Sequence, residues 1–208
     1  MPVRIFKEVI DVTNRLHVLA TSHEKALEIV SAIVAARADC TDNDPFGSRG
    51  WRGWQMGTRR LREVHIDSDG WERDDTDQVP AIINKRLGIR IVVCNTDDGT
   101  AIENSKPQNR HKKGSATDRA IDANQGSFLN RLDESVSVIS IAKRRSPGTG
   151  AILTYFLCVY AEGDDIRAEL SCPVNANIAI LPVAGISKFM RSVIQRCGRH
   201  FPALFRRN

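Results

Sequence analysis

Two apolar runs restrict the possible folds of this chain more than any other feature of its sequence. They are residues 89–94, IRIVVC, and residues 151–161, AILTYFLCVYA, and both are rich in β-branched or aromatic side chains. Strands that are apolar on both faces are typical of the interior of a sheet, where other elements cover each side. We therefore expect a sheet that contains these two inner strands and is covered on both faces.

Two further segments predict strands near the second run. Residues 136–143, VSVISIAK, and residues 166–174, IRAELSCPV, alternate apolar with polar side chains. With residues 151–161 between them, they predict an antiparallel C-terminal β-meander. Pro173 is expected to end the last strand, and residues 175–184 are expected to be irregular. The polar side chains expected to face solvent in that strand are Arg167, Glu169 and Ser171.

Helices are predicted from apolar spacing and from signals at the helix ends. The predicted segments are residues 22–38, 79–87, 117–132 and 186–197. Thr21 and Glu24 have the spacing of a capping box at the start of the first helix. Asp77 is a suitable N-cap for the second helix, and Gly88 is suitable for its C-terminal end.

These elements predict one α+β domain over residues 1–208. We expect a mixed or antiparallel sheet of about five strands with flanking helices. Residues 39–60 and 99–117 are predicted to be long loops, the first because it contains four glycines and a proline. A short strand over residues 61–67, LREVHID, is expected to follow the first loop.

Charge is the main indication of function. The formal net charge is +5 and the isoelectric point is about 9.1, which favours an anionic partner. The charges are also segregated, since residues 45–62 contain five arginines and no acid, whereas residues 63–77 are strongly acidic. The candidate nucleic-acid-binding residues are Arg49, Trp51, Arg52, Trp54, Arg59, Arg60, Arg110, Lys112, Lys113, Arg144, Arg145, Lys188, Arg191 and Arg199.

The tryptophans among these candidates allow three interpretations. Trp51 and Trp54 alternate with arginines in a glycine-rich segment, and such residues can stack on bases and neutralise phosphates. The same residue types are enriched in the centres of protein–protein interfaces. Alternatively, both tryptophans fold back and cover the core. A nucleic-acid-binding protein is the first hypothesis, with phosphate contacts as the main source of affinity.

Two alternative functions remain. One is a protein-interaction or assembly component, viral or mobile-element encoded, that forms homo-oligomers or binds another acidic partner. The other is a metal-dependent nuclease or phosphodiesterase that uses Asp97, Asp98 and Asp69. Only this alternative implies a cofactor, Mg²⁺. Asp97-Asp98-Gly99 also has the composition of an ordinary turn, and no catalytic or metal-binding residue is assigned.

Several motifs of known enzymes do not occur in the sequence. It has no GxxxxGK[ST] phosphate-binding loop and no GxSxG nucleophile motif. The spacing of acids and lysines around Lys143 also departs from the E-x-K pattern of restriction-type nucleases. We therefore favour a binding protein over an enzyme.

Cysteine usage and hydropathy suggest a compartment. The five cysteines are widely spaced and include no CxxC pair, which is typical of reduced thiols. No apolar run approaches about 18 residues, the length of a membrane span, and no apolar signal segment is visible at residues 1–12. A cytoplasmic protein without a membrane partner is the expectation.

Overall fold

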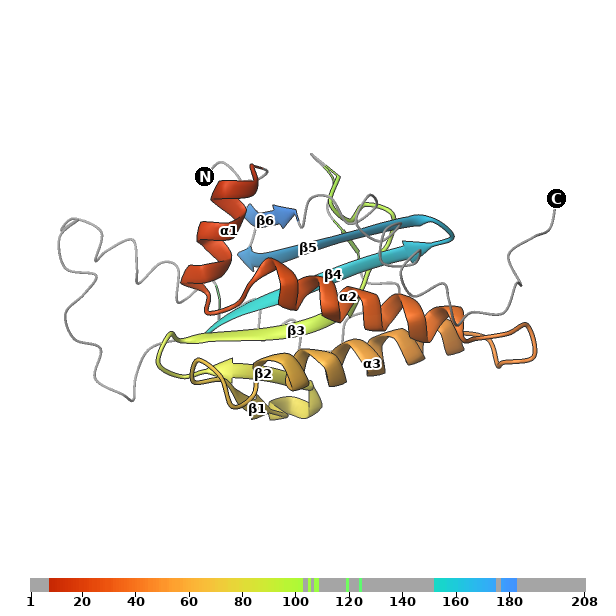
Figure 1. Ribbon diagram of the computed structural model, residues 1–208, viewed down its shortest axis with the longest axis horizontal. Coiled ribbons are helices and arrows are strands. Elements are labelled where there is room, and N and C mark those ends of the chain that lie inside the picture. Colours follow the sequence, from red (N-terminus) through yellow and green to blue (C-terminus); the bar gives the residue numbers. More distant parts are fainter. Residues whose placement is uncertain are drawn as a thin grey trace.

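The computed structural model describes residues 8–102, 105, 107, 108, 119, 124, 152–174 and 177–182. Within this part of the chain, six strands form one mixed sheet in the order β1-β2-β3-β4-β5-β6. Neighbouring strands are antiparallel except β3 and β4, which are parallel (Figure 1). The strands are β1 (Glu72–Asp74), β2 (Ala81–Asn84), β3 (Ile89–Asn95), β4 (Leu153–Glu162), β5 (Asp165–Val174) and β6 (Asn177–Pro182).

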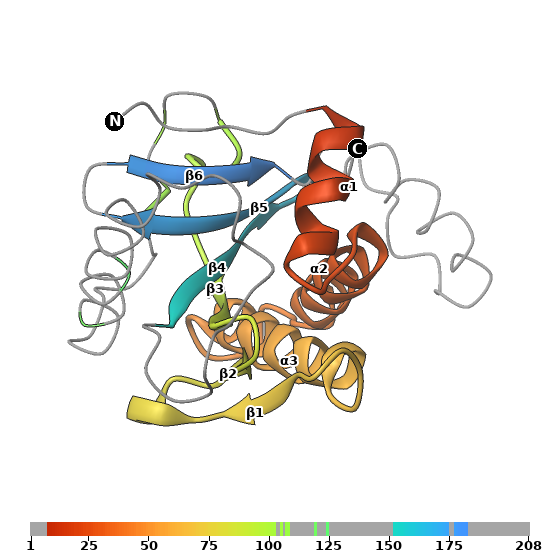
Figure 2. The same cartoon turned by 90° about the vertical axis from the view of Figure 1, so that its left-hand side faces the viewer.

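The described helices lie on one side of this sheet (Figure 2). They are α1 (Val9–Val18), α2 (His23–Ala38) and α3 (Ser48–His65), and a short 3-10 helix, η1 (Thr76–Gln78), joins β1 to β2. Helices α2 and α3 lie side by side, and α1 stands near β5 and β6 (Figure 1). The α+β class with flanking helices, predicted from the sequence, is thereby confirmed.

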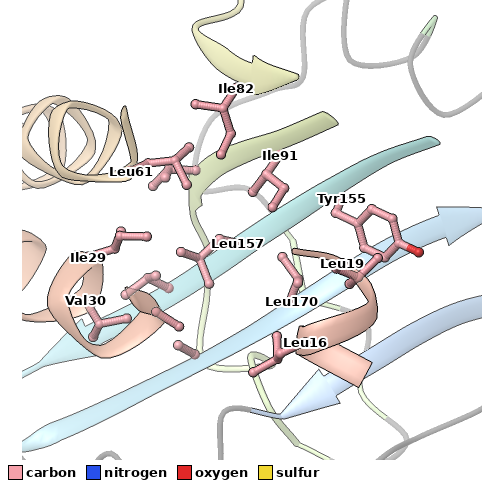
Figure 3. Packing of buried hydrophobic residues seen from close by; sticks show 14 of the residues in the cluster. Leu16, Leu19, Ile29, Val30, Leu61, Ile82, Ile91, Tyr155, Leu157 and Leu170 are labelled. Atoms are coloured by element: carbon pink, nitrogen blue, oxygen red, sulfur yellow. The ribbon is translucent and has the colours of Figure 1, made fainter. Parts of the chain in front are cut away.

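The main core fills the space between the helices and the sheet. Alternate residues of the two inner strands point into it, among them Ile91 of β3 and Leu157 of β4. They meet Ile29 from α2, Leu61 from α3 and Leu16 from α1 (Figure 3). The predicted strands at 89–94 and 151–161 are therefore present, and they form the central parallel pair.

The opposite face of the sheet is also buried. Phe156 and Cys158 of β4 form a second apolar cluster there with Val92 and Ala81. Glu169 on β5, whose register partner is Cys158, is completely buried on this face. The prediction of a half-exposed strand at 166–174 is wrong for Glu169 and for the buried Ser171, although it holds for the partly exposed Arg167.

The largest error of the sequence analysis concerns residues 39–60. Only residues 39–47 form a connection, because α3 begins at Ser48 and continues to His65, through the predicted strand at 61–67. Glycines disfavour an isolated helix, but packing against neighbouring elements can outweigh that preference. Here Gly53 and Gly57 lie on the face of α3 that contacts α2.

These two glycines allow α2 and α3 to approach closely. A Cβ atom added at Gly57 would lie 2.6 Å from Cγ1 of Ile33, which is fully buried, and 3.1 Å from Cγ1 of Val93. A Cβ atom added at Gly53 would lie 2.9 Å from Cγ of Arg37. The guanidinium of Arg37 donates a 2.6 Å hydrogen bond to the carbonyl of Ala161, so this side chain is held in place. Neither position has room for a side chain.

Two other local predictions, for the start of α2 and for the segment at 79–87, are wrong. Ser22, not Thr21, is the N-cap of α2, and its side chain accepts a 3.2 Å hydrogen bond from the backbone N–H of Lys25. The predicted helix at 79–87 is instead strand β2 and the turn that follows it. Its apolar run pairs with both β1 and β3, so every residue of the strand is buried in the sheet.

The C-terminal meander exists with different members. Strand β5 continues through Pro173 to Val174 and pairs with β6, so the irregular segment expected at 175–184 contains a strand. The meander is therefore β4-β5-β6. Other predictions, for the strand at 136–143 and the helix at 186–197, lie outside the described residues. The helix at 117–132 is described only at Arg119 and Asn124.

The close approach of α2 and α3 leads to a stability prediction. We expect Gly57→Ala to lower the free energy of unfolding by roughly 1–3 kcal/mol, because the new methyl group overpacks a site that cannot move aside. Gly50→Ala in the same helix is the matched control, since its Cβ would meet only Nδ2 of Asn95, at 3.9 Å. That control should raise stability by up to about 1 kcal/mol through helix propensity.

Urea unfolding followed by circular dichroism measures both effects. If Gly57→Ala stabilises the protein as much as Gly50→Ala, the close packing of the two helices is refuted. Combining Gly57→Ala with Ile33→Ala should cost less than the sum of the single changes, because the clash with Ile33 is then removed.

Candidate nucleic-acid interface

Arginines cover the outer face of α3. With a rotation of about 100° per residue, Arg49, Arg52, Arg59 and Arg60 fall within one arc of roughly 100° on this helix. The side chains of Arg49, Arg52 and Arg59 are 61%, 45% and 68% exposed. Helix α3 has no acidic residue before Glu63, so its outer face is basic over most of its length. The structure thus brings together the four arginine candidates from this segment.

Each of these arginines has an acidic neighbour. Arg49 pairs with Asp42 at 3.5 Å, and Arg52 pairs with Asp44 at 3.1 Å, both in the connection before the helix. The remaining pairs are Arg59 with Glu63 at 2.7 Å, and Arg60 with Glu28 of α2 and with Glu63 at 3.2 Å. Hydrogen bonds from Arg59 and then Arg60 lower the pKa of the Glu63 carboxyl. The helix therefore carries arginines whose charges are partly balanced at its margins.

The two tryptophans of α3 differ in their environments. Trp51 is 59% exposed, while Trp54 is half-buried, and Phe46, just before the helix, is fully exposed. The interpretation in which both tryptophans cover the core is therefore wrong for Trp51. Phe46 was not among the predicted site residues, because nothing in the sequence distinguishes an exposed phenylalanine from a core residue.

The remaining basic candidates lie outside the described residues. They are Arg110, Lys112, Lys113, Arg144, Arg145, Lys188, Arg191 and Arg199. Their assignment as nucleic-acid-binding residues stays a prediction.

The acids considered for a metal site do not form one group. Oδ1 of Asp97 accepts hydrogen bonds from the backbone N–H groups of Gly99, at 3.2 Å, and Gln108, at 3.0 Å, as in an Asx turn. The backbone oxygen of Asp69 accepts from Asn84, which pairs with the first residue of β3. Asp97 follows the other end of β3, so roughly 20 Å of strand separates it from Asp69. Among the described residues, no three His, Cys, Asp or Glu side chains are placed to hold a metal ion.

His65 is a buried link between three elements. Its Nδ1 lies 2.9 Å from the carbonyl oxygen of Leu61 and therefore donates, which leaves Nε2 to accept from the hydroxyl of Thr21 at 2.8 Å. Its ring meets that of Trp71 edge-on at 5.5 Å. Burial lowers the pKa of His65 to about 4, so the ring is neutral at physiological pH. The spacing of His65 from Leu61, one helical turn, is the sequence signal for this inward position.

Glu169 is a buried carboxyl that the sequence pattern placed on the surface. Its Oε2 accepts a 2.7 Å hydrogen bond from the backbone N–H of Ala101, and its Oε1 accepts from the hydroxyl of Ser171. Arg167, two residues earlier, donates to the carbonyl oxygens of Asp98 and Thr100 at 2.6 and 3.3 Å. Burial raises the pKa of Glu169. These bonds attach the turn after β3 to strand β5, which indicates a structural role.

No family model, curated protein or solved structure matches this chain. Among the described helices, none is both long enough and apolar enough to cross a lipid bilayer.

The buried neutral His65 predicts a loss of stability in mild acid. Because its pKa is about 6.5 in the unfolded chain and about 4 in the fold, its contribution is complete above pH 6.5 and is lost as the pH falls through this window. The difference in unfolding free energy between the parent and His65→Gln should therefore shrink by roughly 3 kcal/mol from pH 6.5 to pH 4. A difference independent of pH would contradict a buried neutral ring.

The raised pKa of Glu169 predicts the opposite trend. The fold binds the proton of this carboxyl more tightly than the unfolded chain does, so the contribution is complete below pH 4.5 and is lost as the pH rises through the folded-state pKa. Glu169→Gln should gain stability over the parent as the pH rises above 4.5, in urea unfolding at a series of pH values. If the unfolding free energies of the parent and of Glu169→Gln depend on pH in the same way, the pKa of Glu169 is not raised in the fold.

Proposed function

We propose that this protein binds nucleic acid through the outer face of α3. The observation that carries the proposal is the placement of Arg49, Arg52, Arg59 and Arg60 on one exposed arc of a rigid helix. A guanidinium can donate two parallel hydrogen bonds to a phosphate, which suits arginine to a nucleic-acid backbone. A helix of this kind holds its donors at fixed intervals along a groove or strand.

The spacing of the arginines fits a repeated anion. Arg49 and Arg59 are ten residues apart, so their backbones are separated by about 15 Å along the helix axis. Arg52 lies between them on the same face. Successive phosphates of one strand are spaced by a few ångströms along a duplex axis, so a helix of this length passes several of them. Each of these arginines would therefore contact a different phosphate of the strand.

The acidic partners of these arginines are compatible with phosphate binding. Ion pairs between exposed side chains contribute about 0–1 kcal/mol, because water and salt screen them. Asp42, which faces Arg49, is fully exposed, and Glu63 is 41% exposed beside Arg59. A phosphate can therefore replace such carboxylates with little loss of free energy. When an arginine neutralises a phosphate, counterions are released from the nucleic acid, and this favours binding. The acids would then restrict binding to ligands with a high density of negative charge.

The proposal is tested by the salt dependence of binding. Arg49→Gln/Arg59→Gln removes two of the most exposed charges, and it should reduce the slope of log K against log[salt] by roughly 2 for duplex DNA, near one unit for each phosphate contact. Fluorescence anisotropy of a labelled duplex over a series of salt concentrations measures this slope. Arg73→Gln/Arg86→Gln removes two exposed arginines that lie outside α3, and it should change the slope little.

Two outcomes would overturn the proposal. One is the absence of binding to DNA or RNA, single- or double-stranded, by the folded parent at low salt. The other is an equal loss of slope in the two double variants, which would assign binding to net charge and not to α3.

A further inference from the structure

Phe46 and Trp51 occupy positions that usually contact each other. The N-cap of α3 is Gly47, so Phe46 is the residue before the cap and Trp51 is the fourth residue of the helix. Apolar residues at these two positions often pack together as a hydrophobic staple, which fixes the direction in which the chain enters the helix. By its sequence alone, the start of α3 has the composition of such a staple.

The staple is open in this structure. Phe46 is fully exposed and Trp51 is 59% exposed, so Phe46 does not pack against the indole ring. The backbone of Gly47 explains the difference, because its φ of 87° and ψ of −8° are left-handed, whereas an ordinary N-cap is extended. The chain therefore enters the helix from another direction, and Phe46 is left fully exposed. Two large aromatic side chains are left in solvent beside the same helix end.

The sequence around this pair contains arginines together with the aspartates that pair with them. Arg52 follows Trp51 directly and lies about 100° from it around the helix, whereas Arg49, on the first turn, lies on nearly the opposite side; that turn contains no acid. The acids nearest in sequence, Asp42 and Asp44, already pair with these two arginines. Exposed aromatic faces next to guanidinium groups match a ligand with flat rings joined by anionic links. An unpaired strand of nucleic acid has this chemistry, since its bases stack on aromatic side chains while arginines contact its phosphates.

We infer that Phe46 and Trp51 stack on unpaired bases, so that single-stranded DNA or RNA is preferred over duplex. This inference rests on the proposed function of α3 and adds the class of nucleic acid. In a duplex each base face is covered by the neighbouring base pair, so the two aromatic side chains would contribute little to the affinity for a duplex. In a single strand, a base can lie against the indole ring of Trp51 while a flanking phosphate meets Arg52.

The experiment compares strands of different type at one salt concentration. Labelled oligothymidylate and oligouridylate of about 16 nucleotides, near the upper site size of single-strand-binding modules, and a duplex of equal length are titrated with the intact protein. For Phe46→Ala/Trp51→Ala, we expect affinity for the single strands to fall roughly tenfold or more. Duplex affinity should change less than twofold. Oligothymidylate and oligouridylate separate a DNA ligand from an RNA ligand.

Two further variants distinguish stacking from apolar contact in general. Trp51→Phe keeps a flat ring and should retain most of the affinity for single strands, whereas Trp51→Leu should lose it. Val18→Ala shortens another exposed apolar side chain, on α1, and should have no effect. Because Phe46 and Trp51 are exposed, all these variants should keep the unfolding midpoint of the parent, which urea unfolding verifies.

The outcomes separate this inference from the proposed function. If Arg49→Gln/Arg59→Gln weakens binding but Phe46→Ala/Trp51→Ala does not, the stacking inference is overturned and the phosphate-binding face stands. If the parent binds no nucleic acid at low salt, both fail together. If the aromatic variants abolish self-association in light scattering while strand affinity is unchanged, the pair is a protein contact, and the inference is likewise overturned.

Discussion

The close contact of α2 with α3 at Gly53 and Gly57 is the constraint on which the rest of the structure depends. Because no Cβ atom separates the helices at these points, Ile33 of α2 lies directly against the backbone of α3. Val93 of β3 reaches the same place from the sheet. Three elements therefore meet at Gly57. A larger residue there would move α3 away from the sheet and open the core beneath it.

This contact also decides what α3 presents to solvent. Once the glycine face is fixed against α2 and the sheet, the arc that carries the arginines, which begins about 20° from Gly53 around the helix, must lie toward solvent. The same register leaves Trp51 at the border of the exposed surface. A segment with few apolar residues and many arginines is thus held rigid by packing on its other side. Under the proposed function, this packing would hold the guanidinium groups in a regular array toward a nucleic acid.

Much of the sheet was predictable, and the first long connection was not. The runs at 89–94 and 151–161 have strand-forming residues and bury both faces, so local composition and tertiary environment agree. In residues 48–60 they disagree, since the glycines indicate a loop while their spacing along one helical face suits a close helix pair. Glu169 failed for a related reason. Alternation predicts a polar face, but it does not reveal that this face is covered and that Ala101 and Ser171 satisfy the carboxyl.

The sequence by itself determined the α+β class, the two inner strands, helix α2 and a basic segment rich in arginine and tryptophan. Periodicity and charge are local properties, so they can be read without knowing which elements meet. Only the tertiary structure decided that the arginine segment is a helix, that His65 is buried and neutral, and that Phe46 stands apart from Trp51. Some of these features depend on contacts between residues that are distant in the chain. Others depend on the left-handed backbone of Gly47, and the amino-acid composition does not determine that backbone conformation.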